Sequence, residues 1–111
     1  MQQLDLPVLD SGNKPPKAFV KHDAGKPRFD LLDADFLQGM AVVMTDGAIK
    51  YADNNWKLCE QPMQRYYAAL QRHLNAFAQG ESRDPDTLMS HLYHAACCVM
   101  FLSWFEKNGG L

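Results

Sequence analysis

Two histidines, His91 and His94, carry the clearest chemical signal in the sequence because they lie three residues apart. In a helix, this spacing puts both imidazole rings on one face, where they can bind one metal ion or flank one group of a substrate. The alternative is that both rings are hydrogen-bonded side chains of a helical core. The spacing alone leaves both interpretations open.

Three carboxylates precede this pair, and they offer the oxygen ligands that hard metal ions need: Glu81, Asp84 and Asp86. Asp84 has a competing structural role as the cap of a helix, and Asp86 has one as a partner of the helix dipole. Glu81 has no such competing role. We therefore expect the three carboxylates and the two histidines to bind a divalent metal ion, with Glu81 and Asp84 also acting in catalysis.

An earlier segment combines a third histidine with two arginines. Arg65 and Arg72 lie seven residues apart on a row completed by alanines, which leaves open space in front of both guanidinium groups. Such space suits a phosphate group, because guanidinium binds phosphate oxygens in pairs. The alternative is a solvated basic face that pairs with the acidic residues of 81–86. His73 adjoins Arg72 and flanks the apolar stripe, so we expect it to act in catalysis.

Helices must position these side chains. The spacing of apolar residues predicts two helices before the His91–His94 pair. One begins near Asp33 or Asp35, either of which can cap it, and ends at the turn residues 53–55. The next covers residues 63–79 and ends at Gly80. No segment has the pattern of a strand longer than a few residues.

The third predicted helix runs from Pro85, with Asp84 as its N-cap, to about residue 106. From Leu92 onward it is apolar on nearly every face. A helix that is hydrophobic all round must be surrounded, and two other helices of so short a chain can hardly cover it. We therefore expect an all-α fold of three main helices whose bundle is completed by a homo-oligomer, most simply a dimer.

Length and composition fit one small domain: the 111 residues are 47% hydrophobic and carry a net charge of −2. The 11 Lys and Arg residues against 13 Asp and Glu residues provide no broad positive surface for duplex nucleic acid. Residues 1–27 contain four prolines and no helical or strand period. We expect an extended arm over 1–27 and a single α-helical domain over 28–111.

The cysteines bear on the compartment. Two of the three are adjacent, at 97 and 98, which makes a poor disulfide framework and favours free thiols in a reducing environment. The first residues lack the basic and apolar regions of a signal peptide. Residues 88–105 are apolar enough to raise the question of a membrane span, but two histidines and the lack of a basic flank favour a buried helix. We expect a cytoplasmic protein without a membrane partner.

Several short motifs follow one another over about residues 22–105: Lys26–Leu32, Gly47–Tyr51, Asn55-Trp56, Arg65–Ala69, Arg72-His73, Gly80-Glu81, Asp84–Asp86 and His91–Ala95. Each motif alone is weak. In this order they resemble the phage and prophage family known as the dATP/dGTP diphosphohydrolase N-terminal domain. The chain departs from the family pattern at Leu88, where the family usually has glycine.

The resemblance implies an all-α fold similar to that of nucleoside triphosphate pyrophosphohydrolases, which cleave between the α and β phosphates with a divalent metal ion. It implies hydrolysis of purine deoxynucleoside triphosphates to monophosphate and pyrophosphate, in the cytoplasm of an infected or lysogenic bacterial host. A non-catalytic phage module that binds a nucleotide or a host protein is the alternative. A third interpretation is a structural helical dimer.

The resemblance also extends the expected site. It assigns phosphate neutralisation to basic residues at the matching positions, and nucleotide contacts to the asparagine–tryptophan pair: Lys26, Arg28, Lys50, Asn55 and Trp56. Tyr51, Trp56 or Tyr66 can stack on the base. The chain lacks the Glu-x-x-Glu metal motif of the broader superfamily, so its metal ligation has to differ. Histidine ligands favour Mn²⁺, Co²⁺ or Zn²⁺ over Mg²⁺.

Overall fold

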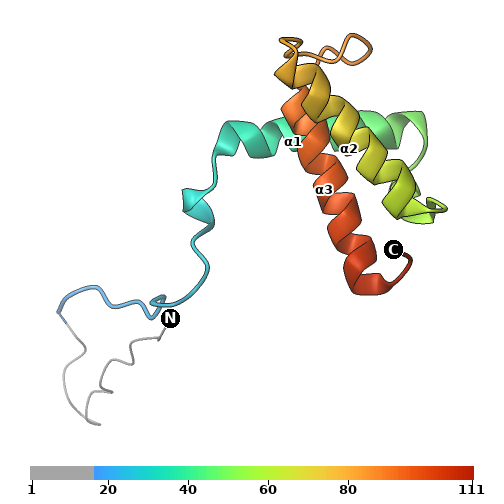
Figure 1. The fold of residues 1–111 in the computed structure, drawn as a ribbon. Coiled ribbons are helices and arrows are strands. Elements are labelled where there is room, and N and C mark those ends of the chain that lie inside the picture. Colours follow the sequence, from blue (N-terminus) through green and yellow to red (C-terminus); the bar gives the residue numbers. More distant parts are fainter. Residues whose placement is uncertain (1–16) are drawn as a thin grey trace. The chain divides into compact units, whose positions relative to one another are not determined.

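The computed structural model describes residues 17–111, and the first 16 residues of the predicted arm lie outside this part. The chain divides into two units, Met1–Leu32 and Asp33–Leu111. The second unit contains the helices α1 (Ala34–Lys50), α2 (Pro62–Ala78) and α3 (His91–Asn108), which Figure 1 labels. No strand occurs among the described residues, so the predicted all-α fold is confirmed.

The described part of the first unit, residues 17–32, is mostly exposed chain. It contains a turn in which the Lys26 amide donates to the Asp23 carbonyl (3.1 Å), followed by the short 3₁₀ helix η1 (Phe29–Leu31). Arg28 forms an exposed ion pair with Asp30 at 2.7 Å, and this guanidinium holds the pKa of the Asp30 carboxyl below its usual value. Lys26 and Arg28 thus belong to the first unit, and the other candidate site residues belong to the second.

The predicted cap at the start of α1 is confirmed for one of its two candidates. The Asp33 carboxylate accepts a hydrogen bond from the Phe36 amide (2.9 Å), which satisfies one of the unpaired donors at a helix start. The ring of Phe36 then contacts the edge of Tyr93 in α3, with 5.4 Å between ring centroids. Gly39 lies buried under the same Tyr93 ring, so the two helices approach closely at this point.

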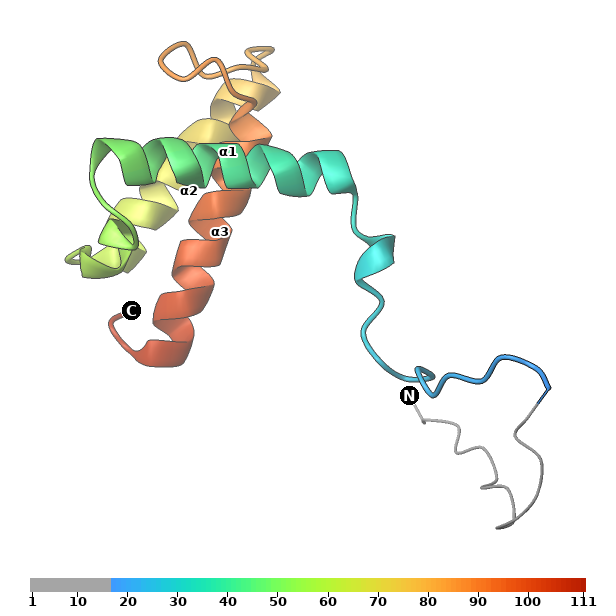
Figure 2. The same ribbon diagram turned by 180° about the vertical axis from the view of Figure 1, so that it is seen from behind.

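The other two helices form an antiparallel pair. α2 and α3 lie side by side, and α1 crosses the pair, as the two opposite views in Figures 1 and 2 show. α2 begins with Pro62, whose fixed φ suits a first helical position, and ends one residue before the predicted end, with Gly80 at φ 99° beyond it. This arrangement puts the end of α2 next to the start of α3.

The predicted start of the third helix is wrong. α3 begins at His91 with Ser90 as its N-cap, and not at Pro85 with Asp84 as its cap. The Asp84 side chain does bind the two amides that follow it, but the chain then turns away at Leu88, whose φ is 62°. The residues between α2 and α3 form a loop, and this loop brings Asp84 back over the helices.

The buried core lies mainly on α3. The buried hydrophobic side chains of the described residues are all on this helix: Ala95, Cys97, Cys98 and Phe105. The Cys97 thiol contacts the Met40 carbonyl of α1 at 3.7 Å. Burial raises the pKa of both core thiols to about 11, so they remain protonated near neutral pH.

An aromatic cluster continues the core towards the short 3₁₀ helix η2 (Asn55–Leu58). The Trp56 ring stacks on the Phe101 ring with 4.7 Å between centroids. The centroid of the Tyr66 ring of α2 lies 4.8 Å from that of Phe101. These contacts hold the segment between α1 and α2 against α3.

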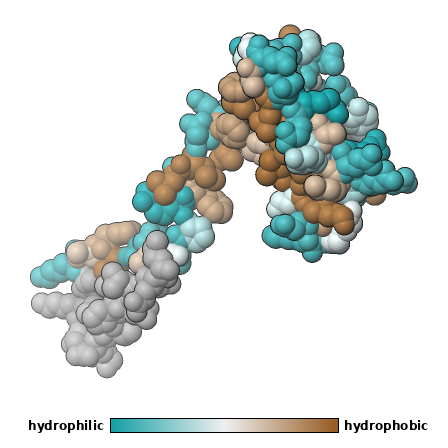
Figure 3. Space-filling model, viewed as in Figure 1, coloured by the Kyte–Doolittle hydropathy of each residue, from teal (hydrophilic) through white to brown (hydrophobic). Residues whose placement is uncertain are grey.

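Much apolar surface stays exposed. On α2, the apolar side chains of Met63, Leu74 and Phe77 keep 39% to 48% of their surface exposed. Val99 of α3 keeps 53%. Figure 3 shows apolar side chains gathered along α3 on the face that it draws.

None of the described helices is both long and apolar enough to cross a membrane.

Candidate functional site

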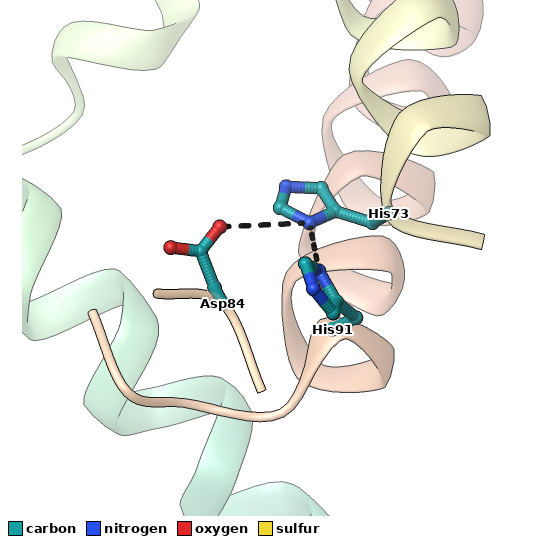
Figure 4. Close-up of side chains that lie close together, drawn as sticks. All are labelled: His73, Asp84 and His91. Carbon is teal, nitrogen blue, oxygen red and sulfur yellow. Dashed lines mark hydrogen bonds and ion pairs between the residues drawn. The ribbon is translucent and has the colours of Figure 1, made fainter. Parts of the chain in front are cut away.

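Three side chains from α2, the following loop and α3 meet at one point (Figure 4): His73, Asp84 and His91. The Nδ1 atoms of His73 and His91 are 2.9 Å apart, and Asp84 Oδ2 is 4.0 Å from His73 Nδ1. One ligand atom from each residue lies within 4.8 Å of the others. Two neighbouring ligands of an octahedral ion lie about 3 Å apart, which is the spacing of the two imidazole nitrogens, and with Asp84 these residues could hold one divalent metal ion.

The loop between α2 and α3 positions Asp84 through hydrogen bonds. Oδ1 of Asp84 accepts from the amides of Asp86 (2.8 Å) and Thr87 (3.2 Å), which leaves Oδ2 facing His73. The Asp84 amide donates to the Met89 carbonyl (2.8 Å), so the loop folds back on itself. One carboxylate oxygen therefore fixes the loop, and the other belongs to the cluster.

Glu81 lies behind His91 and outside the cluster of ligand atoms. Its Oε1 is 2.7 Å from Nε2 of His91. A carboxylate can only accept, so Nε2 carries the hydrogen and the Nδ1 lone pair of His91 points towards His73. This is the carboxylate–histidine arrangement that orients many metal ligands. Glu81 is a predicted metal ligand, and in the structure its carboxylate contacts the ring nitrogen of His91 that faces away from His73.

The charge states in the cluster suit a cation. Burial, assisted by the neighbouring histidines, lowers the pKa of His73, and burial likewise lowers the pKa of His94. Burial alone would raise the pKa of Asp84, but the Asp86 and Thr87 amides and the nearby imidazoles bring it below its usual value. Near neutral pH these rings are neutral and the carboxylate is charged, as metal ligands must be.

His94 lies one layer beyond the cluster. Its ring stacks almost parallel on His73, with 4.7 Å between centroids, and its Nε2 is 2.7 Å from Thr87 Oγ1. It is not among the three grouped ligands, so the structure brings together His91 and His73 and not the His91–His94 pair expected from spacing. Asp86 is exposed, and its amide donates a hydrogen bond to Asp84 Oδ1 in the loop.

A pocket of about 590 Å³ opens beside these rings. We call it the histidine pocket, and its chemically relevant lining residues come from α1, the segment after it, α2, the loop and α3: Asp46, Lys50, Tyr51, Asn55, Trp56, Tyr66, His73, Thr87, His94 and Phe101. His73 belongs to both the pocket wall and the ligand cluster. A molecule bound in this pocket therefore lies against the cluster.

The predicted nucleotide contacts differ in how available they are. Lys50 lines the histidine pocket with its Nζ 3.5 Å from Asp46. The Trp56 ring stacks on Phe101, and the Lys57 ammonium lies 5.4 Å from its centre, so this ring is mainly part of the aromatic cluster. Tyr51 is 72% exposed and lines the pocket, which leaves it available for stacking.

The two arginines line a different pocket, of about 560 Å³. We call it the arginine pocket, and it lies between η2 and α2: Asn55, Leu58, Cys59, Glu60, Arg65, Tyr66, Ala69 and Arg72. Asn55 and Tyr66 line both pockets. The Tyr66 hydroxyl donates to the Trp56 carbonyl (2.8 Å) and so holds this shared wall in place.

Sequence reasoning missed two residues of the site, Thr87 and Asp46. Thr87 carries no signal of its own, because single hydroxyl residues are common in loops. Asp46 precedes Lys50 by four residues, and this spacing is the usual pattern of a helical ion pair. The pattern was present in the sequence and predicts the contact.

The family model for the N-terminal domain of dATP/dGTP diphosphohydrolase matches residues 16–111. The chain belongs to this family. The resemblance found in the sequence motifs is therefore confirmed.

A curated relative of this family domain is the dATP/dGTP diphosphohydrolase of Salmonella phage PMBT28. It is 32% identical over 89 residues, which are 80% of this chain. The chain spans 30% of the length of that relative. No solved structure matches the chain.

Proposed function

We propose that this diphosphohydrolase domain hydrolyses purine (deoxy)nucleoside triphosphates to monophosphate and pyrophosphate with a divalent metal ion bound by His73, Asp84 and His91. The observation that carries the proposal is the convergence of three ligand atoms within 4.8 Å, one of them on His73, which also lines the pocket of about 590 Å³. The name of the phage relative supports the substrate class. The cytoplasm of an infected or lysogenic bacterium, where such nucleotides occur, belongs to the same proposal.

The ligand set favours particular ions. Two imidazoles and one carboxylate suit Mn²⁺, Co²⁺ or Zn²⁺ better than Mg²⁺, which prefers oxygen ligands. A bound ion supplies charge neutralisation at phosphate oxygens and lowers the pKa of a water molecule. Glu81 keeps His91 in the tautomer whose Nδ1 lone pair faces the cluster.

The protein's own groups in the histidine pocket have separate roles. Lys50 neutralises phosphate charge there. His94, neutral and held by Thr87, accepts a proton from the attacking water. The water oxygen bonds to phosphorus as the bond between the α phosphorus and the bridging oxygen breaks, and pyrophosphate leaves with that oxygen.

Base recognition falls to the aromatic side of the pocket. Tyr51 provides the exposed ring on which a purine stacks, because Trp56 is already packed against Phe101. Asn55 lines the same wall and offers an amide that can both donate and accept hydrogen bonds.

The test is a product analysis with a panel of nucleotides and ions. The purified chain is incubated with dATP, dGTP, dCTP and dTTP, each with Mg²⁺, Mn²⁺, Co²⁺ or Zn²⁺, and the products are separated by anion exchange. We expect monophosphate and pyrophosphate in equal amounts from the purine nucleotides, and none after chelation. A His91→Asn variant that is folded but equally active would contradict the proposed site.

A second candidate function is nucleotide binding without hydrolysis. It is favoured by the length comparison, because the chain spans 30% of its curated relative. In that case the same panel gives saturable nucleotide binding in calorimetry but no pyrophosphate with any ion. Turnover with any of the four ions excludes this alternative.

A further inference from the structure

We propose that the arginine pocket is an oxyanion site in its own right, which binds a pyrophosphate-like group through Arg65 and Arg72. This goes beyond the proposed reaction, in which the histidine pocket and the metal ligands act on the nucleotide. The inference rests on that function only for the class of ligand, a chain of linked phosphates.

The first observation is that neither guanidinium forms an ion pair with a carboxylate of residues 17–111. The ion pairs among the described residues join Arg28 to Asp30, Lys50 to Asp46, and two histidines to acidic groups. The acidic loop is already engaged, because Glu81 binds His91 and Asp84 binds the loop amides and faces His73. Arg65 and Arg72 therefore form no salt bridges with the acidic residues of this loop, as the alternative of a solvated basic face would require.

The second observation is the shape of the surface that holds these charges. Arg65 and Arg72 are two helical turns apart on α2, a rise of about 10 Å, and Ala69 lies between them in the same pocket. The small side chain leaves room for an anion, and two guanidinium groups of this reach can converge on it from either side.

The third observation is the charge balance and polar lining of the pocket. Its charged residues are Arg65, Arg72 and Glu60, which leaves one net positive charge, and the Asn55 amide adds a hydrogen-bond donor. A linked phosphate offers several acceptor oxygens and more than one negative charge, so it can engage both arginines at once. A single neutral or cationic ligand gains nothing from this arrangement.

The shared phosphate chemistry has two sources. The group can be the phosphate tail of a nucleotide whose base lies in the histidine pocket, because Asn55 and Tyr66 line both pockets. It can also be a separate molecule, such as the pyrophosphate product.

The experiment titrates inorganic pyrophosphate into the whole chain by calorimetry, in the presence of a chelator. We expect one pyrophosphate per chain, with an affinity that weakens as salt is raised. Arg65→Gln and Arg72→Gln should each weaken it by about tenfold or more, since each removes charge-assisted hydrogen bonds to the phosphate oxygens. Circular dichroism checks that both variants are folded.

Two charge-matched controls locate the binding. Arg83→Gln removes an arginine that lines neither pocket, and Lys107→Gln removes a lysine in the last turn of α3 that also lines neither pocket. Both should bind pyrophosphate within about twofold of the parent, because neither removes a group from the arginine pocket. No binding to the parent, or a loss in Arg83→Gln as large as that in Arg72→Gln, would overturn the proposal.

Competition with dATP in the same chelated buffer distinguishes the two sources. If the group is a nucleotide tail, dATP displaces pyrophosphate from the parent and itself binds more weakly to Arg72→Gln. If it is a separate molecule, both ligands bind at once. Because the titrations contain no metal and need no turnover, they separate this inference from hydrolysis: His91→Asn should keep its pyrophosphate binding even if it loses activity.

Discussion

At the scale of single residues, the two carboxylates nearest the histidines do different work. Asp84 uses Oδ1 for the loop amides and faces His73 with Oδ2, whereas Glu81 binds the far side of the His91 ring. A group that only orients a ligand changes metal affinity without abolishing it. The structure thus gives different contacts to two carboxylates that the sequence presents as equivalent.

The first prediction follows from this separation. Glu81→Gln should weaken Mn²⁺ or Zn²⁺ binding by about 10–100-fold, because the His91 ring loses its charged hydrogen-bond partner. Asp86→Asn is the matched control, since its carboxylate is exposed and outside the ligand group, and it should leave affinity unchanged. Metal titration by calorimetry measures both. Equal affinities for Glu81→Gln and the parent would refute the orienting role.

The second prediction concerns pH. Folding lowers the pKa of His73 and of His94 from the usual 6.5, chiefly through burial, so the unfolded chain binds more protons once the pH falls through that value. Stability of the metal-free chain should therefore decrease from about pH 7 to pH 5. Asp84, whose folded pKa is also lowered, adds a loss in the same direction at more acidic pH.

Urea unfolding at several pH values measures this effect. A variant with both His73→Asn and His94→Asn should show a shallower slope between pH 7 and pH 5, because it lacks the two titrating rings. A parent protein that becomes more stable on acidification would contradict the prediction.

Residue chemistry was predictable where side-chain type restricts the role. The histidines and Asp84 could be selected because imidazole and carboxylate are the common metal ligands. Which two histidines meet could not, because His73 and His91 are joined by the packing of α2 on α3, and spacing within one helix says nothing about that. The division of the cationic residues between two pockets was equally hidden.

Among the elements, the loop between α2 and α3 contains one residue with an unfavourable backbone conformation. Leu88 has a φ of 62°, in the left-handed region that disfavours a branched side chain, and it is 67% exposed. The loop therefore keeps a strained backbone where the side chain gains little from packing.

The third prediction compares two substitutions at this position. Leu88→Gly should be more stable than Leu88→Ala by about 1 kcal/mol, because both remove the exposed side chain but glycine also tolerates the positive φ. Thermal unfolding of the two variants side by side measures the difference. An alanine variant as stable as the glycine variant would show that the loop relaxes without strain.

The fourth prediction concerns the contact between α1 and α3. Gly39→Ala should destabilise the fold by about 1–3 kcal/mol, because its new methyl group would overlap the Tyr93 ring. Gly47→Ala in the same helix meets nothing within 4 Å and should stabilise it by up to about 1 kcal/mol. Chemical denaturation checks the pair, and two variants of equal stability would argue against the close crossing.

Helix existence was predictable and one boundary was not. Apolar spacing and the Asp33 cap indicated α1, and α2 ends within one residue of its predicted end. The start of α3 was missed because Asp84 followed by Pro85 is the pattern of a capped helix. The same carboxylate also forms a turn when the chain behind it leaves the helical region, as it does at Leu88.

At the scale of the whole molecule, apolar surface exceeds what the described chain covers. Val99 lies in the middle of α3 with 53% of its surface exposed. Met63, Leu74 and Phe77 of α2 are exposed as well. Large exposed apolar patches are typical of interaction surfaces. We therefore keep the proposal that a second copy of the chain covers this surface.

The fifth prediction tests that assembly. Analytical ultracentrifugation at micromolar concentration should show a dimer or a larger homo-oligomer. Val99→Lys should shift the protein towards the monomer, because a charge would be buried at the interface. Gln71→Lys, which adds the same charge at an exposed position of α2, should leave the assembly intact. A folded parent monomer would exclude this mode of completing the bundle.

The grouping of His73, Asp84 and His91 also has a mechanical consequence. The two histidines are 18 residues apart. An ion coordinated by both would therefore close a loop of chain that contains the end of α2, the connecting segment and the start of α3. It would act as a removable cross-link, and closing a loop of comparable length with a disulfide contributes about 3 kcal/mol through the entropy of the unfolded chain. The helical hairpin would then be tightest when the centre is loaded, and chelation would loosen the very segment that carries the ligands.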